Sequence, residues 1–225
     1  MPRDLPLANG HLLVNFDANY DLRDLYWPHI GERNHTEGHV NRFGVWVEGA
    51  FAWLDAPDWQ RELRYEPETQ VTQVTLTHPG LRLTLACADT VDFDRDLFIR
   101  KVRVTNLDEQ AREVRLFYHQ DWHLWENAGA NTVYYHPGMH ALIAYKDRCN
   151  VLVNGLVGDA RAGAPEGERQ AHVGVHHWAT GYKEFNSQQG TWRDAEDGVL
   201  EGNPIAQGSV DSCVAFHLGL LDPGT

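Results

Sequence analysis

Apolar residues recur at every second position over most of this chain, and no stretch of about twelve residues repeats them with a helical period. Leu81, Leu83 and Leu85 alternate with the polar residues Arg82 and Thr84, which is the pattern of a strand with one buried and one more polar face. In all, the pattern predicts roughly a dozen strands. They are expected near residues 11–16, 43–47, 51–54, 71–78, 81–87, 97–105, 111–119, 132–136, 140–145, 150–157, 169–178 and 210–219.

Turn-forming residues separate neighbouring strands at hairpin spacing. Glu48-Gly49, Pro79-Gly80 and residues 106–108 each lie between two consecutive predicted strands. Short turns of this kind join antiparallel neighbours, because parallel strands need a much longer crossover. The sequence therefore predicts an all-β protein, built as a large antiparallel sandwich of two sheets with few short helices.

Segments without the alternation are short. The pattern leaves room for helical turns near residues 57–62 and 181–187. Residues 158–168 are small and polar, which indicates an exposed loop, and residues 187–209 are poor in apolar side chains, which indicates a long structured loop. Strands continue on both sides of these loops, so we expect residues 1–225 to form a single domain.

Composition and charge exclude several classes of function. The 225 residues include 19 Lys and Arg against 32 Asp and Glu, a formal net charge of −13. No basic stripe is present to bind a nucleic-acid backbone or an anionic membrane surface. No apolar run approaches the roughly 20 residues of a membrane-spanning helix. Residues 1–6 lack the apolar region of a secretory signal, so the chain is expected to be cytoplasmic.

Cysteine usage agrees with a reducing compartment. Cys87, Cys149 and Cys213 are far apart in the sequence and form no C-x-x-C pair. We expect three buried free thiols, and neither a disulfide framework nor a zinc knuckle.

Two groups of histidines have a spacing that metal sites also use. His35 and His39 flank Glu37, but the neighbouring Asn34 and Gly38 indicate a hydrogen-bonded loop instead of a metal-binding helix. A second group, in a strand-like segment, is interpreted in the same way, as ordinary polar residues. It consists of His172, His176 and His177. No metal and no cofactor are expected.

Acidic residues offer two further candidates. Asp194, Glu196 and Asp197 resemble half of a calcium loop, but their spacing departs from that pattern, so an acidic cluster that fixes a loop is favoured. Glycoside hydrolysis needs two carboxylates that flank a sugar pocket. The acids surrounded by aromatic residues are Glu37, Asp121, Glu126 and Glu184, and the sequence does not show that any two converge.

Aromatic residues concentrate in two segments, around 26–29 and 121–127. Such residues form ledges for sugar rings, and they also pack in cores and between domains, which is the favoured interpretation here. The candidates for contact with a sugar edge or another domain are Tyr26, Trp27, His35, Trp122, Trp125 and Glu126.

Several ordered segments together resemble the N-terminal domain of bacterial and archaeal glycoside hydrolase family 15 proteins, which include glucoamylases, glucodextranases and trehalases. The likeness extends from about residue 7 to about residue 219. The segments are ANGHLLVNFD (8–17), DLYWP (24–28), GERNH (31–35), FGVWV (43–47) with Trp53, TVYY (132–135) with HALIAYK (140–146), and GTWRDAEDG (190–198) with IAQGSVDS (205–212).

This resemblance implies a supersandwich fold like that of galactose mutarotase, in agreement with the alternation. It also implies that catalysis resides elsewhere. Two glutamates of a following α-helical barrel would hydrolyse an α-glucosidic bond with inversion of the anomeric configuration. We therefore assign no catalytic residue to this chain. Few residues follow the last predicted strand, so we expect the N-terminal part of a longer hydrolase whose barrel is its partner.

Two alternatives remain open: a stand-alone carbohydrate-binding protein with an oligosaccharide partner, and an enzyme like the aldose mutarotases. Fold analogy alone is a weak argument for either. A surface that normally packs against the barrel would be exposed in the isolated chain, so the fragment is also expected to self-associate.

Overall fold

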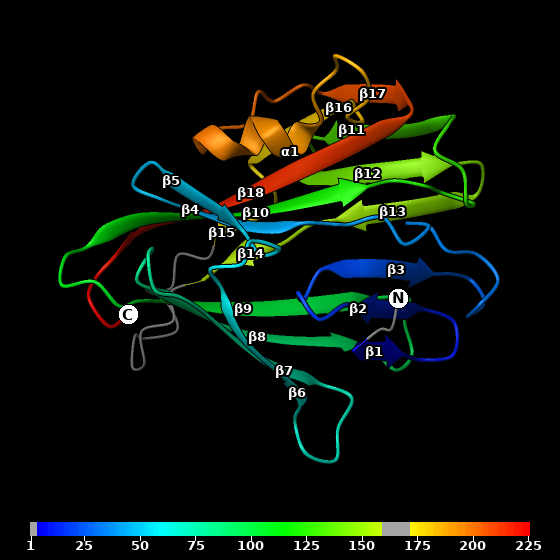
Figure 1. The fold of residues 1–225 in the computed structure, drawn as a ribbon. Helices are drawn as coiled ribbons and strands as arrows, with labels where there is room; N and C mark the ends of the chain where they lie inside the picture. The colour runs from blue at the N-terminus through cyan, green and yellow to red at the C-terminus, as the bar shows by residue number, and fades with distance from the viewer. Residues whose placement is uncertain (1–3, 159–171) are drawn as a thin grey trace.

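A computed structural model describes residues 4–158 and 172–225, which fold almost entirely into antiparallel strands (Figure 1). The all-β, antiparallel part of the prediction is confirmed. The strands are β1 (Leu5–Ala8), β2 (Leu13–Phe16), β3 (Leu22–Tyr26), β4 (Phe43–Val47), β5 (Ala50–Trp53), β6 (Gln60–Tyr65), β7 (Thr72–His78), β8 (Leu83–Val91), β9 (Phe98–Asn106), β10 (Arg112–Asp121), β11 (Asn131–His136), β12 (Ala141–Lys146), β13 (Cys149–Val153), β14 (Leu156–Val157), β15 (His172–Val173), β16 (His177–Tyr182), β17 (Ile205–Gly208) and β18 (Val210–Leu221).

The strands of the described residues are distributed over five sheets. The largest has the order β16-β18-β10-β4-β5, and the two four-stranded sheets have the orders β6-β7-β8-β9 and β13-β12-β11-β17. β1-β2-β3 and β14-β15 form the smaller ones. This division is finer than the predicted pair of large sheets, and the two-sheet sandwich stays a prediction.

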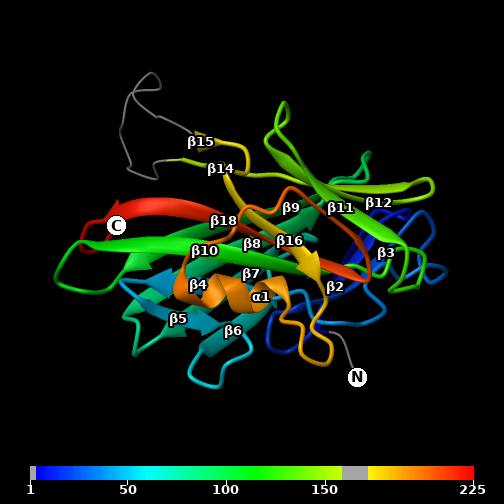
Figure 2. The same ribbon diagram turned by 90° about the horizontal axis from the view of Figure 1, so that it is seen from above.

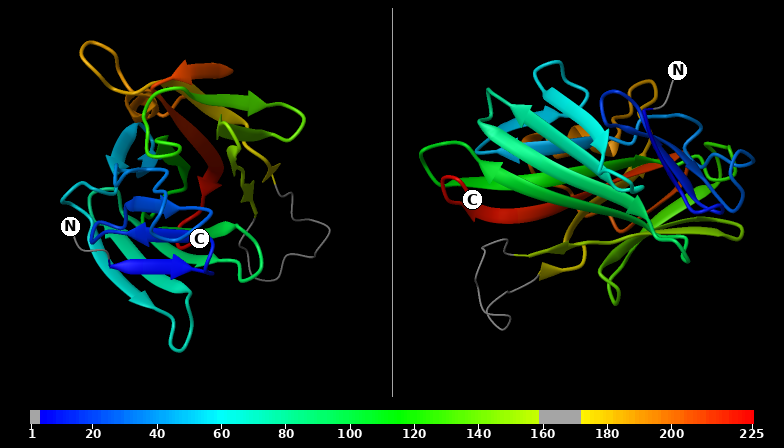
Figure 3. Two further views of the ribbon diagram at one scale, coloured as in Figure 1. Left: turned by 90° about the vertical axis from the view of Figure 1, so that its right-hand side faces the viewer. Right: turned by 90° about the horizontal axis from the view of Figure 1, so that it is seen from below.

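The main hydrophobic core joins three of these sheets. Leu83 and Leu85 of β8 are buried together with Val45 of β4, Leu116 of β10 and Val14 of β2. Figure 1 shows β6 to β9 on the opposite side of this core from β4, β10 and β18, and the side view in Figure 3 shows the same separation. The alternation at residues 81–85 therefore gave the buried face of β8 correctly.

Two of the three predicted turns are hairpins. β4 and β5 pair antiparallel across Glu48-Gly49, and β7 and β8 pair across the turn that contains Pro79-Gly80. The prediction for residues 106–108 is wrong, because β9 pairs with β8 whereas β10 pairs with β4 and β18. This connection crosses from one sheet to another. The buried side chain of Asn106 holds the crossing by donating to the backbone oxygens of Gln110 and Leu221, both at 2.8 Å.

The helical turns allowed near 57–62 and 181–187 are also wrong. Residues 60–62 belong to β6, an edge strand, and residues 181–182 end β16, which pairs with β18. The helical elements of the described residues are α1 (Thr191–Asp194) and the adjoining 3-10 turn η1 (Ala195–Asp197). They lie with β17 in the segment expected to be a long loop, where Ala195 is buried against Trp53 and Phe117.

The three cysteines are free and buried, as expected. Burial raises the pKa of Cys87 to about 12 and that of Cys149 to about 11. Few thiolates therefore exist at neutral pH.

A buried ion pair occupies the core beside these apolar residues. Arg100 of β9 lies directly across from Asp89 of β8, and its Nε donates to Asp89 Oδ1 at 2.7 Å. Asp89 is fully buried and also accepts hydrogen bonds from the hydroxyls of Tyr20 and Thr72. Further aromatic rings surround the guanidinium at centroid distances of 5.0 to 5.8 Å, with Tyr20 nearer at 4.6 Å. They are Phe16, Phe43, Phe98 and Tyr118.

We predict that Asp89→Ala lowers the free energy of unfolding by roughly 3–5 kcal/mol, because it leaves the Arg100 charge buried without its counter-ion. Urea denaturation measures this loss. Glu184→Ala is the control, since it breaks an exposed pair with Arg193 and should change stability far less. Equal losses in the two variants would contradict a structural role for the buried pair.

Candidate functional site

The two segments that sequence analysis selected lie against each other. We call residues 26–39, which follow β3, the Trp27 loop, and residues 121–128, at the end of β10, the Trp125 loop. Glu126 joins them: its two carboxylate oxygens accept from Arg33 Nη1 at 3.0 Å and from the backbone N–H of Asn34 at 3.2 Å. The backbone N–H of His123 donates to the carbonyl of His35 at 2.9 Å. The loops therefore form one continuous structure.

His35 is the buried centre of this junction. Its Nδ1 accepts the backbone N–H of Trp125 at 3.1 Å, so its Nε2 is the donor to the carbonyl of Trp27 at 2.8 Å. The imidazole also packs edge-on against the Trp125 ring and lies 3.7 Å from Cys149 Sγ. Burial lowers the pKa of His35, so the ring is neutral at neutral pH.

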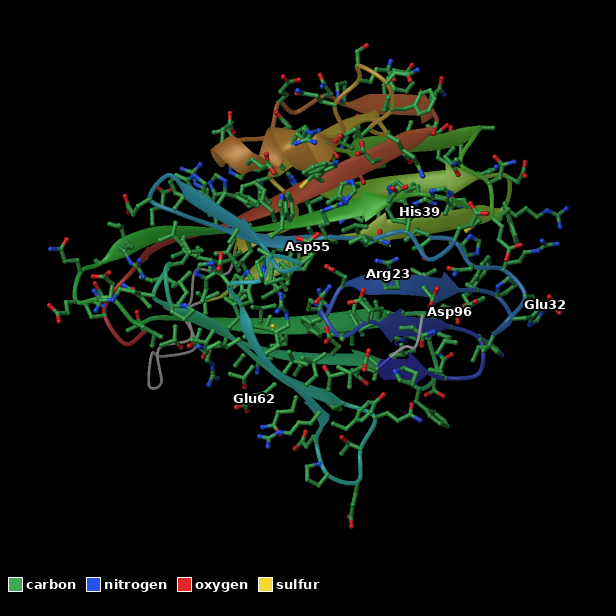
Figure 4. All side chains as sticks on the ribbon, viewed as in Figure 1. Arg23, Glu32, His39, Asp55, Glu62 and Asp96 are labelled. Carbon is green, nitrogen blue, oxygen red and sulfur yellow. The ribbon has the colours of Figure 1, made fainter. Side chains whose placement is uncertain are left out.

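A group of charged side chains lies beside His35, and we call it the polar cluster: Glu37, His39, Asp121, His123 and Lys183. Figure 4 labels His39, which leaves the Trp27 loop toward the end of β10. His123 Nδ1 is 2.5 Å from Glu37 Oε2, and its Nε2 is 3.0 Å from Asp121 Oδ1. The rings of His39 and His123 stack at a centroid distance of 4.1 Å. Lys183 donates to Asp121.

The charges of the polar cluster depend on one another. Burial would raise the pKa of Asp121, but the contacts with His123 and with the Lys183 ammonium hold it well below its usual range. Burial lowers the pKa of Lys183, and Asp121 opposes that shift. Burial and the neighbouring His123 lower the pKa of His39. Asp121 is therefore a carboxylate at neutral pH.

Among the described residues, one group of three or more His, Cys, Asp and Glu side chains has the spacing of a metal site. It consists of His39, Asp121 and His123, whose ligand atoms lie within 4.8 Å of one another. Sequence analysis missed this group because its members come from two segments. The loop conformation predicted around Glu37 and Gly38 is confirmed, since residues 35–38 form turns.

The other histidine and acidic candidates whose contacts the structure describes bond within their own segments or to a neighbouring ring. His176 Nε2 contacts the carbonyl of Val173, while the side chain of His172 lies outside the described residues. The carboxylates of the 194–197 segment accept hydrogen bonds from backbone N–H groups of the following residues or from a tryptophan indole. Asp194 accepts from the backbone N–H of Glu201, Asp197 from that of Val199, and Glu196 from Trp53 Nε1.

The aromatic candidates use their polar atoms within the protein. Trp122 is buried, and its Nε1 donates to Ser212 Oγ at 2.9 Å. The half-buried Trp27 and Trp125 donate to Asp96 Oδ2 at 2.7 Å and to the Lys146 carbonyl at 3.2 Å.

Tyr26 is half-buried at the end of β3, and Glu126 is exposed. Of the six predicted site residues, the structure joins Trp27, His35 and Trp125 directly. Glu126 reaches the Trp27 loop through Arg33 and Asn34, and Trp122 belongs to the core cluster that also contacts Trp27 and Trp125.

Each carboxylate proposed for glycoside hydrolysis has a positively charged or imidazole partner. Glu126 pairs with Arg33 and Glu184 with Arg193; Asp121 pairs with Lys183 and Glu37 with His123. The backbone N–H of Asn34 together with Arg33 lowers the pKa of Glu126, and Arg193 lowers that of Glu184. A general acid needs the opposite shift.

Sequence reasoning also missed an apolar surface on the sheet β13-β12-β11-β17. Residues from all four strands form one lateral row: Ile205 and Ile143 both lie opposite Tyr134, and Leu152 lies opposite Ile143. Their neighbours in sequence point to the other face, where Val133, Ala144 and Val151 pack in the core.

We call this row, with Tyr145, the outer apolar face. Leu152 is 47% exposed and Ile205 54% exposed. Figure 2 shows β11 and β12 at one side of the molecule, beyond β10 and β18. The run of apolar residues in β12, ALIAY, was the signal available in the sequence, but it does not say what covers each side.

We predict that the stability contributed by His35 and His217 is lost as the pH falls below about 6.5, the pKa of an unperturbed histidine. The unfolded chain binds protons on His35 and His217 more readily than the native state does, because burial lowers both pKa values, that of His217 to about 4. The stabilisation is complete above that pH and is lost on acidification. Urea denaturation at pH 7.5 and pH 5.0 measures the loss, which should be smaller in His35→Gln. An unchanged loss in that variant would exclude His35 as a source.

No family model matches the chain. A stretch of 149 residues, 66% of the chain, is 24% identical to an uncharacterized glycosyl hydrolase of Methanocaldococcus jannaschii. The fold is similar to that of a bacterial glucoamylase crystallised with acarbose, with a TM-score of 0.67 and 15% identity over 96% of this chain. The chain spans only 22% of the first protein and 32% of the second. These two similarities support a domain related to glycoside hydrolases.

None of the described helices of the chain is long and apolar enough to cross a membrane.

Proposed function

We propose that this chain is a non-catalytic, N-terminal domain of a family 15 type glycoside hydrolase that cleaves α-glucosidic bonds. Its sheets would form the two halves of a supersandwich, and a separate α-helical barrel would carry the two catalytic glutamates. The fold similarity carries this proposal, because it covers 96% of this chain but only 32% of a glucoamylase chain. What the chain resembles is therefore one part of such an enzyme.

The contacts of the charged and aromatic side chains at the candidate site favour a non-catalytic role for this domain. The four carboxylates that could have formed a hydrolytic pair are held by Arg33, Arg193, Lys183 and His123. The indole N–H groups of the Trp27 and Trp125 loops are bonded to protein acceptors. Neither a free acid–base pair nor an unoccupied aromatic ledge is apparent among these residues.

We place the contact with the barrel on the outer apolar face. A sheet face that exposes Leu152, Ile205 and Tyr145 in one apolar surface is costly to leave in water. The Trp27 and Trp125 loops stay proposed as the edge of the same contact or of the sugar site, because Glu126 and parts of both indoles are exposed. The same apolar face would make the isolated chain self-associate, which analytical ultracentrifugation measures.

We predict that the isolated chain folds but releases no glucose from maltose, trehalose or starch fragments, whereas the native polypeptide detected by immunoblot is larger than 25.6 kDa. In that native polypeptide, Leu152→Lys with Ile205→Lys should lower hydrolysis at least tenfold and lower Tm, because charged side chains cannot be buried against the barrel. Glucose release and calorimetry measure the two effects.

The control is Leu220→Lys at the end of β18, because Leu220 is 69% exposed and lies outside this sheet. It should leave hydrolysis and Tm unchanged. A native product of 25.6 kDa would overturn the proposal. Trp fluorescence changes with maltooligosaccharides would then favour a carbohydrate-binding protein, and faster glucose anomer exchange would favour a mutarotase.

A further inference from the structure

In the polar cluster, the imidazole of His123 lies between two carboxylates, those of Glu37 and Asp121. A contact between the two loops does not by itself require this arrangement. Glu37 Oε2 lies 2.5 Å from His123 Nδ1, so in the neutral imidazole that nitrogen carries the proton and donates it. The other nitrogen, Nε2, then has a lone pair directed out of the ring. A carboxylate that orients an imidazole in this way is the usual partner of a metal-binding histidine.

The lone pair of His123 meets another acceptor. Nε2 is 3.0 Å from Asp121 Oδ1, and it is buried without a well-aligned hydrogen-bond partner among the described residues. Only 5% of His123 is exposed, so water does not readily compensate. In the neutral ring these two acceptors repel each other, and either a proton or a metal ion between them removes that repulsion.

A third ligand is available at the same place. His39 is exposed, its ring stacks on that of His123, and its ligand nitrogen lies within 4.8 Å of those of His123 and Asp121. The next residue toward the N-terminus is Gly38, with φ of 76° in a turn. A modest rotation of the exposed ring would direct its nitrogen to the point that Nε2 and Oδ1 face.

We propose that His39, Asp121 and His123 bind a divalent transition-metal ion of the zinc class, with Glu37 as the residue that orients His123. Two imidazoles and one carboxylate suit zinc and its neighbours, whereas magnesium and calcium prefer oxygen ligands alone. The bound ion links the Trp27 loop to the end of β10. Because one side of the site is exposed through His39, water completes the coordination.

Lys183 competes with the ion for the same carboxylate. Its ammonium contacts Asp121 Oδ1, the oxygen that also faces His123. Metal binding therefore requires Lys183 to move to solvent or to the second carboxylate oxygen. This competition distinguishes the proposed site from a surface histidine that binds metal by chance, since removal of a lysine should then tighten binding.

The test is calorimetric titration of the EDTA-treated, dialysed protein with zinc chloride, with magnesium chloride as the hard-cation comparison. We expect one zinc per chain and no response to magnesium. Cobalt should bind at the same site with visible absorption bands of a low-symmetry complex, a signature that a purely structural role of these residues would not produce. His39→Ala should remove binding, and because His39 is exposed this variant should fold normally.

Two further variants test the roles of the neighbours. Lys183→Met should tighten zinc binding about tenfold or more by removing the competing charge, and Glu37→Gln should weaken it by roughly 10–100-fold. His11→Ala is the matched control, since His11 is an exposed histidine far from the polar cluster in sequence. Absence of zinc binding, or binding that persists in His39→Ala, would overturn the proposal. Neither result would affect the proposed role in a glycoside hydrolase.

Discussion

The charge of Arg100 is the constraint on which much of this fold depends. A guanidinium in a protein core needs a counter-ion in close contact, and Asp89 provides it from the neighbouring strand. Tyr20 and Thr72 then complete the hydrogen bonds of Asp89. Aromatic rings from β2, β4, β9 and β10 cover the guanidinium, so the need to compensate one charge fixes the relative positions of three sheets.

The same principle operates at the junction of the two loops. Glu126 binds Arg33, which is 93 residues away in sequence, and Lys183 binds Asp121 across 62 residues. Carboxylates in such ties are ionised and have partners, so they are poor general acids. The carboxylates that the sequence offered as candidates for hydrolysis thus make contacts between segments of the fold, which supports the proposed non-catalytic role.

The outer apolar face and the polar cluster differ in chemical character, and each is proposed to bind a different partner. The outer apolar face has exposed side chains and no charged partner in its central row, and it suits a large apolar contact. The polar cluster has the opposite character, with the ligand atoms of two histidines and a carboxylate within 4.8 Å of one another. One surface is proposed to bind another domain and the other a metal ion, and the two proposals rest on different residues.

The sequence by itself determined most of the strands and the simple hairpins, but it missed β1, β3, β6 and β17. The alternation at Leu83 and Leu85 and the turn at Glu48-Gly49 depend on adjacent residues, so local patterns suffice to predict them. Only the tertiary structure decided that residues 106–108 cross between sheets and that His39 meets His123. These outcomes depend on contacts between distant segments, whose packing and compensation of charge no local pattern contains.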